Sequence, residues 1–403
     1  QTVEMLEAYG LGPEMGHKEC GGVRGQIDDN GHMTHVMEQL EVDWKYSYGV
    51  QTADNELLAR IIVKEIFRLN GLEVSFQAKP VAAKMKNGKV VNLFAPKDMH
   101  TEFLSAVGYG SMMGLLKNYE VINPFISSTI DSLNRLKPGF EAPVCIVTSL
   151  GLSPEVPSRN RTILAGLIRD IDSPMATRIE MRSPNPYTNT YLAIAAFYIS
   201  MLDGIKACVE SGKTLKEMEN ELSKKAGDEG FYLEKDREYR SEHDVFEDYN
   251  EEERAHLFGK PPATVWENMC AIKNYPEKIA VLTTGNILKK EFIESFAKGA
   301  LIRWQTELLN RIIPEYHKEI CLMKKLHDDD NHTTHDAAMW EKIAAMRNTM
   351  AKDVTEQPSL FTMTREAFAR GDFDAASNLQ LEMAEIMQKL KAQYNEYQHN
   401  IID

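Results

Sequence analysis

The sequence predicts an α+β fold whose later part is purely helical. Two short stretches, residues 40–46 and 178–182, alternate polar and apolar side chains with the period of two that is typical of half-buried strands. Longer stretches with helical spacing lie between and after these strands, and from residue 263 onward helical spacing is the main regular pattern. Strands that alternate with helices in this way indicate an α+β or α/β core.

The composition bounds the class of protein. With 403 residues, the chain is long enough for two or three domains, and its 43% hydrophobic and 26% charged residues are those of an ordinary soluble globular protein. The net charge of -14, without any basic tract, argues against a nucleic-acid partner. Five scattered cysteines form no CxxC pair, which indicates reduced thiols. Because the sequence also contains no signal peptide and no apolar run of membrane length, we expect a cytoplasmic protein without a membrane partner.

The elements expected in the first half follow from breakers, cap residues and periodicity. Gly10 and Gly71 are helix-stop signals, and residues 52–56 supply cap residues for a helix. In order, we expect a helix at residues 1–10, a hairpin loop at 26–35, a strand at 40–46, a helix at 57–70, strands at 72–80 and 88–94, and helices at 104–119 and 124–136.

The second half is expected to be mostly helical. Residues 191–209 predict a helix after the strand at 178–182, and residues 211–262 predict a charged surface insertion. Residues 311–403 predict an antiparallel helical extension, in which two long helices after residue 336 are interrupted near Pro358. The stretch 327–335 has the His and Asp content of a metal cluster, but we interpret it as a solvated acidic loop between helices.

The strand at 178–182 carries the most informative side chains. Arg178, Glu180 and Arg182 share one face because they alternate with Ile179 and Met181. One interpretation is an ion-pair ladder on the surface. The other is a metal-binding carboxylate between two phosphate-binding arginines, since a guanidinium grips phosphate oxygens bidentately and hard divalent cations prefer carboxylate oxygen. The neighbouring motifs decide between these two interpretations.

Glu141 is a second candidate for a functional carboxylate. It lies between Pro138 and Pro143, which stiffen the backbone on both sides. That setting favours a positioned catalytic group, although a glutamate on the surface of a loop explains these residues equally well.

A series of further motifs occurs in a fixed order along residues 5–310. They are Gly16-His-Lys-Glu19, Gln39-Leu-Glu-Val-Asp-Trp-Lys-Tyr46, Gln51-Thr-Ala-Asp-Asn55, Ala78-Lys-Pro80, Asn92-Leu-Phe-Ala95, Asn134-Arg-Leu-Lys-Pro-Gly-Phe-Glu-Ala-Pro143, Ser158-Arg-Asn-Arg161, Arg178-Ile-Glu-Met-Arg-Ser-Pro184 and Asp203-Gly-Ile-Lys206. In sequence and in order, these motifs resemble those of the glutamine synthetase family. One motif would be weak evidence, but this many in the same order make coincidence implausible.

The resemblance implies both a fold and a set of site residues. Residues 1–310 would form a glutamine synthetase-type catalytic domain, with a curved, mainly antiparallel sheet and flanking helices, and residues 311–403 would be an appended helical extension. The implied roles are metal ligands for Glu19, Glu41 and Glu180, phosphate binding and catalysis for Arg161 and Arg182, binding of the substrate carboxylate for Arg135, and removal of a proton from bound ammonium for Glu141.

The function that this resemblance implies is a glutamate–ammonia ligase. Such a ligase uses ATP and Mg²⁺ or Mn²⁺ to form glutamine from glutamate and ammonia through γ-glutamyl phosphate, as part of nitrogen metabolism. The implied assembly is a homo-oligomeric ring, a hexamer or dodecamer, with active sites between subunits. Two alternatives stay open: a γ-glutamyl-amine ligase that uses an organic amine, and a non-catalytic scaffold or regulatory homologue.

Two segments of the family pattern are missing from this sequence. The glycine-rich flap with its histidine is expected after Pro80, where residues 81–87 continue without it. The small N-terminal β domain, and the strand that supplies two further metal carboxylates, are expected before Gln1. Because Val81 and Ala82 join two family-like blocks, we expect both segments to belong to the encoded protein and to be left out of this sequence.

Overall fold

The computed structural model describes the chain except for residues 24–25, 28–32, 35–36, 77–82, 85–92, 138–144, 186, 329, 331, 356 and 402–403. For residues 19–23, 26–27, 33–34, 37 and 83–84 it describes the backbone alone. Three predictions therefore fall outside the described residues. They are the position expected for the flap, the part of the strand at 88–94 up to residue 92, and Glu141.

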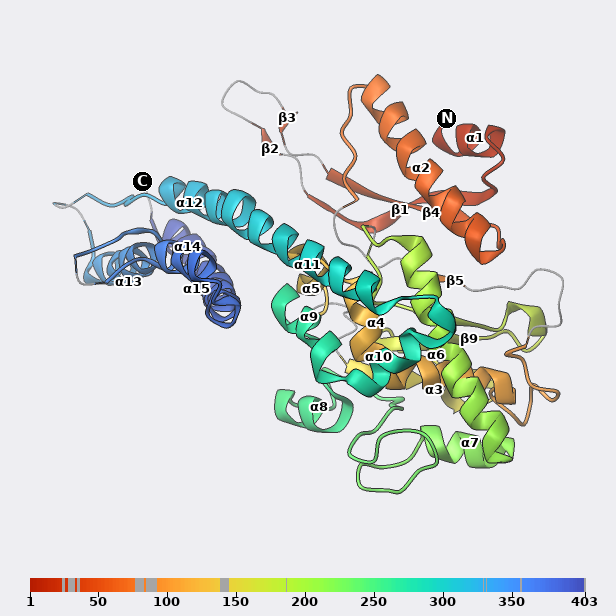
Figure 1. Ribbon diagram of the computed structural model, residues 1–403. Coiled ribbons are helices and arrows are strands. Elements are labelled where there is room, and N and C mark those ends of the chain that lie inside the picture. The colour runs from red at the N-terminus through yellow and green to blue at the C-terminus, as the bar shows by residue number, and fades with distance from the viewer. Residues whose placement is uncertain are drawn as a thin grey trace.

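The N-terminal part is a strand pair packed with two helices (Figure 1). Its elements are α1 (Thr2–Ala8), β1 (Pro13–Val23), β2 (Gln26–Ile27), β3 (Met33–Thr34), β4 (Met37–Trp44) and α2 (Gly49–Leu69). β1 and β4 pair antiparallel with His17 opposite Glu41, and β2 and β3 form a separate short pair, as the expected hairpin requires. Leu6, Leu11 and Ala59 form a small buried core that joins the helices to the strands.

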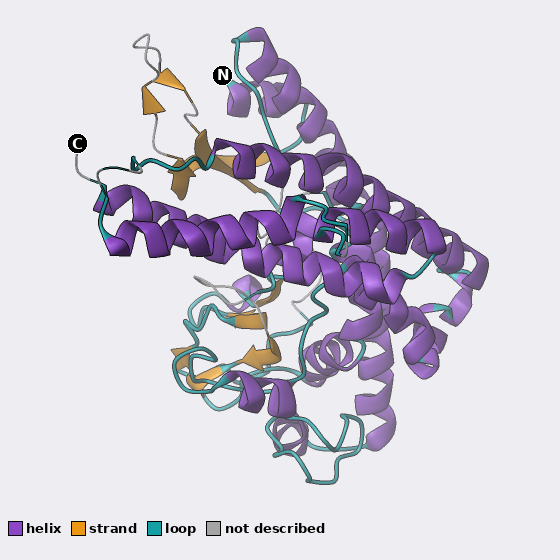
Figure 2. Cartoon of the chain, turned by 90° about the vertical axis from the view of Figure 1, so that its left-hand side faces the viewer, coloured by secondary structure: helices purple, strands orange, loops and turns teal. Residues whose placement is uncertain are grey.

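The central sheet has four strands in the order β5-β10-β9-β6. Its strands are β5 (Ala83–Lys84), β6 (Cys145–Ser149), β9 (Ile163–Ile168) and β10 (Arg178–Met181), and a short hairpin of β7 (Gly151–Ser153) and β8 (Val156–Pro157) follows β6. All pairings among the described strands are antiparallel except that of β6 with β9. The described strands are mainly antiparallel, as expected, but they form several small sheets, and Figure 2 shows them gathered in separate groups.

Strand β10 confirms the alternation predicted for residues 178–182. Ile179 and Met181 are fully buried, whereas Arg178 and Glu180 are half-buried. The polar row therefore lies on the face of the sheet that points away from the hydrophobic core.

Helices α3 (Ala106–Lys117), α4 (Tyr119–Ile126) and α6 (Thr190–Ser211) pack against this sheet, and the short α5 (Ile130–Asn134) follows α4. α3 and α6 approach each other so closely that a Cβ atom on Gly204 would overlap the Gly110 carbonyl oxygen, and one on Gly114 would overlap the Ser200 carbonyl oxygen. Only glycine permits this approach, which brings two apolar helices into full contact.

The charged stretch 211–262 contributes to the core as well as to the surface. It contains α7 (Leu215–Leu222) and α8 (Glu251–Phe258), and it buries Leu233, Tyr239 and Val245. Thr148 in β6 donates its amide to the Tyr239 carbonyl oxygen (2.8 Å), and the Ser241 amide donates to the Thr148 carbonyl oxygen (3.0 Å). Residues 239–241 therefore cover the outer edge of β6, a role that their charged composition does not reveal.

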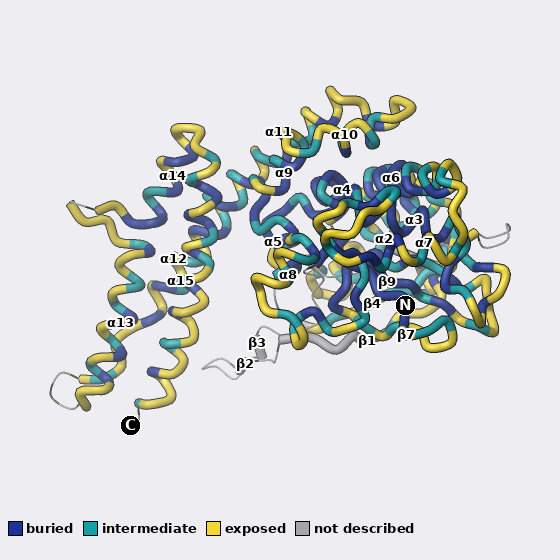
Figure 3. Tube along the Cα trace, turned by 90° about the horizontal axis from the view of Figure 1, so that it is seen from below, coloured by how far each residue is buried: buried dark blue, intermediate teal, exposed yellow. Residues whose placement is uncertain are grey.

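The C-terminal helices, apart from α10, share one hydrophobic cluster, and Figure 3 shows buried stretches along them. They are α9 (Val265–Asn274), α10 (Pro276–Leu282), α11 (Lys290–Glu307), α12 (Ile313–Leu322), α13 (Thr334–Ala351), α14 (Leu360–Arg370) and α15 (Phe373–Asn400). A π-helical turn, η3 (Leu308–Ile312), joins α11 to α12, so one continuous helix runs through residue 310. Ile130 and Leu133 of α5 belong to the same cluster as Trp304 and Met383, so the cluster spans both sides of the expected domain boundary.

Several expected element boundaries are wrong. α2 begins at Gly49, eight residues before the predicted start, and residues 72–76 form no strand. The helix expected at 124–136 is divided into α4 and α5 by residues 127–129, and the region after residue 336 holds three helices, since Gly371 with a positive φ of 71° ends α14. Two short 3-10 turns, η1 (Pro174–Ala176) and η2 (Thr284–Asn286), complete the described elements.

Within the described part of the chain, one helix, α6, is long and apolar enough to cross a membrane by length and composition alone. A core helix meets the same criteria. α6 packs along α3 through Gly204, and Ala196, Phe197 and Ser200 are buried there, which agrees with the helix predicted for residues 191–209.

Candidate functional site

A histidine and two carboxylates meet on the β1–β4 pair. Glu41 and Asp43 share one face of β4 because they are two residues apart, and the antiparallel register places His17 opposite Glu41. The ligand atoms of His17, Glu41 and Asp43 all lie within 4.8 Å of one another, and His17 Nδ1 is 3.6 Å from Asp43 Oδ2. Among the described side chains, this is the one group of three with such spacing.

This donor set fits a divalent cation. Carboxylate oxygen suits Mg²⁺ and Mn²⁺, and imidazole nitrogen is a ligand that the softer first-row cations accept. Asp43 has only 15% of its side chain exposed, and His17 has 36%, so the cluster opens to solvent mainly through Glu41. The two carboxylates repel each other, and a cation between them would relieve that repulsion.

A second group of charged side chains lies where β10 ends. Glu180 Oε1 is 3.2 Å from Arg182 Nη1, and both side chains are mostly buried, with 23% and 11% exposed. β5 pairs with β10, with Lys84 opposite Glu180, so the backbone that follows the expected flap position runs beside this strand.

Arg161 lies at the same end of the sheet as Arg182. The Arg182 amide donates to the Leu164 carbonyl oxygen (2.9 Å), and β9 runs antiparallel to β10. Arg161 stands three residues before Leu164, just ahead of β9, and is exposed. The two candidate phosphate-binding arginines thus flank one sheet end.

Arg135 contacts the backbone of the segment that carries Arg182. Its guanidinium donates to the carbonyl oxygens of Arg182 (3.0 Å), Ser183 (3.1 Å) and Pro184 (3.2 Å). Burial lowers the pKa of Arg135 to about 10, and the nearby positive charge of Arg182 adds to that lowering. Arg135 stays charged at neutral pH, so it brings a third cation to this region.

The described residues show where most of the predicted site lies. Glu41 lies in β4 and Glu180 in β10, which belong to different sheets, and Glu180 is not a member of the His17–Glu41–Asp43 group. The Glu19 backbone lies in β1, but its side chain, like all of Glu141, is outside the described residues. Convergence of Glu19, Glu41 and Glu180 on shared cations stays a prediction.

Sequence reasoning missed His17 and Asp43 as candidate ligands. The strand pattern at 40–46 already places Asp43 on the face of Glu41. His17, in contrast, joins them only through a strand pairing between distant segments, which the pattern does not specify. The histidines in the stretch 327–335 make packing contacts within the helical extension. His327 Nδ1 lies 2.6 Å from the Tyr397 hydroxyl, and the His327 ring stacks on that of His332 with 4.9 Å between ring centroids.

These elements define the class of protein: an α+β domain with a histidine–carboxylate cluster suited to a divalent cation and a set of arginines suited to an anionic group. A family model described as glutamine synthetase, catalytic domain, matches residues 3–231. The chain therefore belongs to the glutamine synthetase family, and this part of it corresponds to the catalytic domain of that family.

Individual relatives carry the same name. Proteins called glutamine synthetase from Frankia alni and Pyrococcus horikoshii are 32% and 31% identical to this chain over 214 and 234 residues. The matches cover 51% and 57% of this chain, and 40% and 47% of those proteins. The chain thus spans less than half the length of these curated relatives. A solved structure titled as glutamine synthetase from Plasmodium falciparum aligns with a TM-score of 0.49 at 20% identity, over 70% of this chain and 55% of that one.

Proposed function

We propose that this protein is an ATP-dependent ligase that forms glutamine from glutamate and ammonia through γ-glutamyl phosphate. The observation that carries the proposal is the His17–Glu41–Asp43 cluster, because it contains one of the predicted metal carboxylates and lies in the part of the chain that the family model matches. Family membership supports ATP and Mg²⁺ or Mn²⁺ as the nucleotide and the metal.

The metal would be held on the β1–β4 pair by Glu41, with His17 and Asp43 beside it and Glu19 as a further ligand. When bound, a divalent cation supplies positive charge that neutralises the transferring phosphoryl group. Glu180 is proposed as the ligand from the central sheet, where its ion pair with Arg182 holds the carboxylate in one orientation.

The arginines are proposed to stabilise the negative charge that moves from ATP to glutamate. Arg161 and Arg182 lie at one end of the β9–β10 pair and would grip phosphate oxygens through their planar guanidinium groups. Arg135 would bind the substrate carboxylate with any donors that its three backbone carbonyl partners leave available. Glu141 is proposed to accept a proton from ammonium, which makes the nucleophile neutral before it attacks the acyl phosphate.

An organic amine is the alternative nucleophile. The residues proposed to bind phosphate and metal serve an amine ligase equally well, so the acceptor is decided near Glu141. A second alternative is a non-catalytic relative with a scaffold or regulatory role. The sequence keeps Glu19, Glu41, Glu141, Arg161, Glu180 and Arg182, which argues against this alternative, because a site without chemistry has no physical need for that set.

The decisive experiment is an assay of ATP-dependent phosphate release by the full-length protein with glutamate and Mg²⁺ or Mn²⁺. Ammonium, putrescine and ethanolamine are compared as nucleophiles. Activity that requires ammonium supports the glutamate–ammonia ligase, and activity with an organic amine alone supports the amine ligase. An assembled full-length protein that is inactive with all three nucleophiles would leave the scaffold as the remaining function.

Assembly and location complete the proposal. We expect a homo-oligomeric ring, a hexamer or dodecamer, in the cytoplasm, with active sites between subunits. Analytical ultracentrifugation of the full-length protein tests the ring, and a monomer at micromolar concentration would contradict it.

A further inference from the structure

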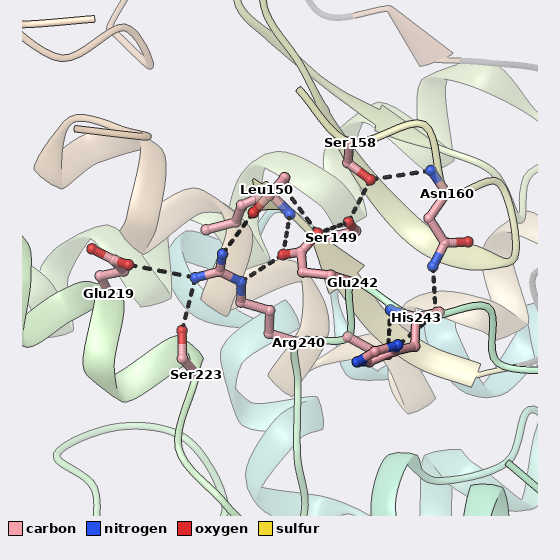
Figure 4. A network of polar contacts seen from close by, with 11 residues as sticks. Ser149, Leu150, Ser158, Asn160, Glu219, Ser223, Arg240, Glu242 and His243 are labelled. Carbon is pink, nitrogen blue, oxygen red and sulfur yellow. Dashed lines mark hydrogen bonds and ion pairs between the residues drawn. The ribbon is translucent and has the colours of Figure 1, made fainter. Parts of the chain in front are cut away.

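A network of polar contacts connects the charged stretch to the loop that precedes β9 (Figure 4). At its centre is the carboxylate of Glu242, which is only 18% exposed. It accepts hydrogen bonds from the backbone amides of Leu150 (3.1 Å) and Gly151 (2.9 Å), from Arg240 Nε (2.7 Å) and from the Ser149 hydroxyl. A carboxylate with four donors is held in a single position.

The contacts continue from Ser149 into the loop that carries Arg161. The Ser149 and Ser158 hydroxyls are hydrogen-bonded to each other, and Ser158 Oγ accepts the Asn160 amide (3.1 Å). The Asn160 side chain donates to the His243 carbonyl oxygen (2.7 Å) and accepts the Thr162 amide (2.9 Å). Both neighbours of Arg161 are therefore fixed by hydrogen bonds.

The direction of the hydroxyl protons follows from the chemistry of the acceptor. An ionised carboxylate only accepts, so the single proton of the Ser149 hydroxyl points at Glu242. The Ser158 hydroxyl then donates to Ser149, and its own lone pair receives the Asn160 amide. The negative charge of Glu242 thus sets the orientation of the whole chain of donors, as far as the residue before Arg161.

Arg240 balances the negative charge of Glu242 and also holds the Glu242 carboxylate in place through its own contacts. Its guanidinium donates to the Ser223 hydroxyl and to the Gly151 carbonyl oxygen, both at 3.0 Å, and lies 3.5 Å from Glu219 in α7. The network therefore joins the segment that covers the edge of β6 to the loop that precedes β9.

We propose that Glu242 is a positioning residue for Arg161. This proposal rests on the proposed function, in which Arg161 binds the transferring phosphate. The network fixes the backbone at Asn160 and Thr162, while Arg161 between them is exposed and stands just ahead of β9, at the sheet end where Arg182 lies. A guanidinium on a fixed backbone needs no reorganisation when phosphate charge develops. The charged stretch thus supplies a part of the site.

The test compares Glu242→Gln with Glu238→Gln in the full-length protein. Glu238 is buried on the same segment and pairs with Lys225, but it has no contact with the loop before β9 in the described structure. We expect Glu242→Gln to lower kcat about tenfold with the KM for glutamate changed by no more than about twofold, because phosphate positioning acts in the transition state. Glu238→Gln should keep the wild-type kcat.

Hydrogen–deuterium exchange gives a readout that does not depend on activity. Amides of residues 158–162 should exchange faster in Glu242→Gln and at the wild-type rate in Glu238→Gln. Ser149→Ala breaks the link to Ser158 while leaving the amide contacts of Glu242, so it serves as the second variant if Glu242→Gln does not fold, with a kcat loss of about threefold.

The outcomes separate this inference from the proposed function. An active wild-type protein whose Glu242→Gln variant keeps its kcat, or keeps slow exchange at residues 158–162, overturns the inference alone. An inactive wild-type protein refutes the proposed function, and the exchange rates then decide whether Glu242 fixes the loop.

Discussion

The guanidinium of Arg135 donates a hydrogen bond to the carbonyl oxygen of Arg182 at 3.0 Å, so one arginine fixes the backbone of the other. Its further bonds to Ser183 and Pro184 extend that contact along three consecutive residues after β10. Because the planar fork of arginine serves several acceptors at once, Arg135 determines where Arg182 leaves the sheet. A single side chain thus links α5, which it follows, to the candidate phosphate site.

Replacing Arg135 with lysine should therefore affect stability and activity together. An ammonium group cannot reach three carbonyl oxygens as a fork does, and carbonyl oxygens left without donors lower the free energy of unfolding by about 1–3 kcal/mol. Urea denaturation of Arg135→Lys measures this loss, and kcat/KM should fall about tenfold or more. Arg68→Lys is the matched control, since Arg68 is exposed near the end of α2 and its side chain pairs with Glu65 one turn earlier in the described structure. Wild-type stability of Arg135→Lys would contradict the assignment.

The cluster on β1 and β4 predicts a measurable cation site. Asp43→Asn and His17→Asn should each weaken Mn²⁺ binding about tenfold to a hundredfold, because each removes one member of a three-residue donor set. Isothermal titration calorimetry of the full-length protein gives the Kd directly. His100→Asn is the control, since His100 is 64% exposed and pairs with Glu155 elsewhere on the chain. Equal Kd values for all three variants would exclude the cluster as a metal site.

A glycine at the crossing of α3 and α6 and a glycine on exposed α11 should respond to alanine substitution in opposite ways. Gly204→Ala places a methyl group against the Gly110 carbonyl oxygen and should lower the free energy of unfolding by about 1–3 kcal/mol. Gly299→Ala lies on the exposed face of α11 with no heavy atom within 4 Å and should raise it by about 1 kcal/mol, because alanine favours the helix. Thermal denaturation of both variants checks the sign of each change. A stabilising Gly204→Ala would mean that the two helices are farther apart.

Asp336 predicts an acid-sensitive helical extension. Hydrogen bonds from Thr333, and then from Asn400, lower the pKa of the Asp336 carboxyl below its ordinary value. A carboxyl with a lowered folded-state pKa stabilises the fold above its unfolded pKa of about 3.9, and this contribution is lost as the pH falls further toward the folded-state pKa. Circular dichroism during acid titration should show a weaker pH dependence for Asp336→Asn than for the wild-type protein. Identical titration curves would contradict this role.

The local pattern of the sequence was enough to predict the elements whose side chains alternate or repeat regularly. The period of two at residues 178–182 is confirmed by the burial of Ile179 and Met181, and the helix at 191–209 is confirmed by α6. Boundaries were less predictable, since α2 begins at Gly49 with Tyr48 as a cap that lacks a side-chain hydrogen bond, and nothing in its composition marks that start.

The candidate site was predictable only where its residues belong to one strand or one motif. Glu180 with Arg182, and Glu41 with Asp43, follow from spacing along a strand. His17 joins Glu41 through pairing between β1 and β4, and Glu242 reaches Ser149 across 93 residues. Such long-range contacts depend on how elements pack, which a local pattern of polar and apolar residues does not encode.

The unbroken helix through residue 310 has a consequence for any truncation of this protein. Because α11, η3 and α12 form one continuous helix and share their cluster with Ile130 and Leu133, a protein shortened at residue 310 would end inside a helical turn and lose much of that cluster. α5 leads directly into Arg135. The residues after 310 therefore belong to the same hydrophobic cluster as the helix that leads into Arg135, and their removal should affect the position of Arg135.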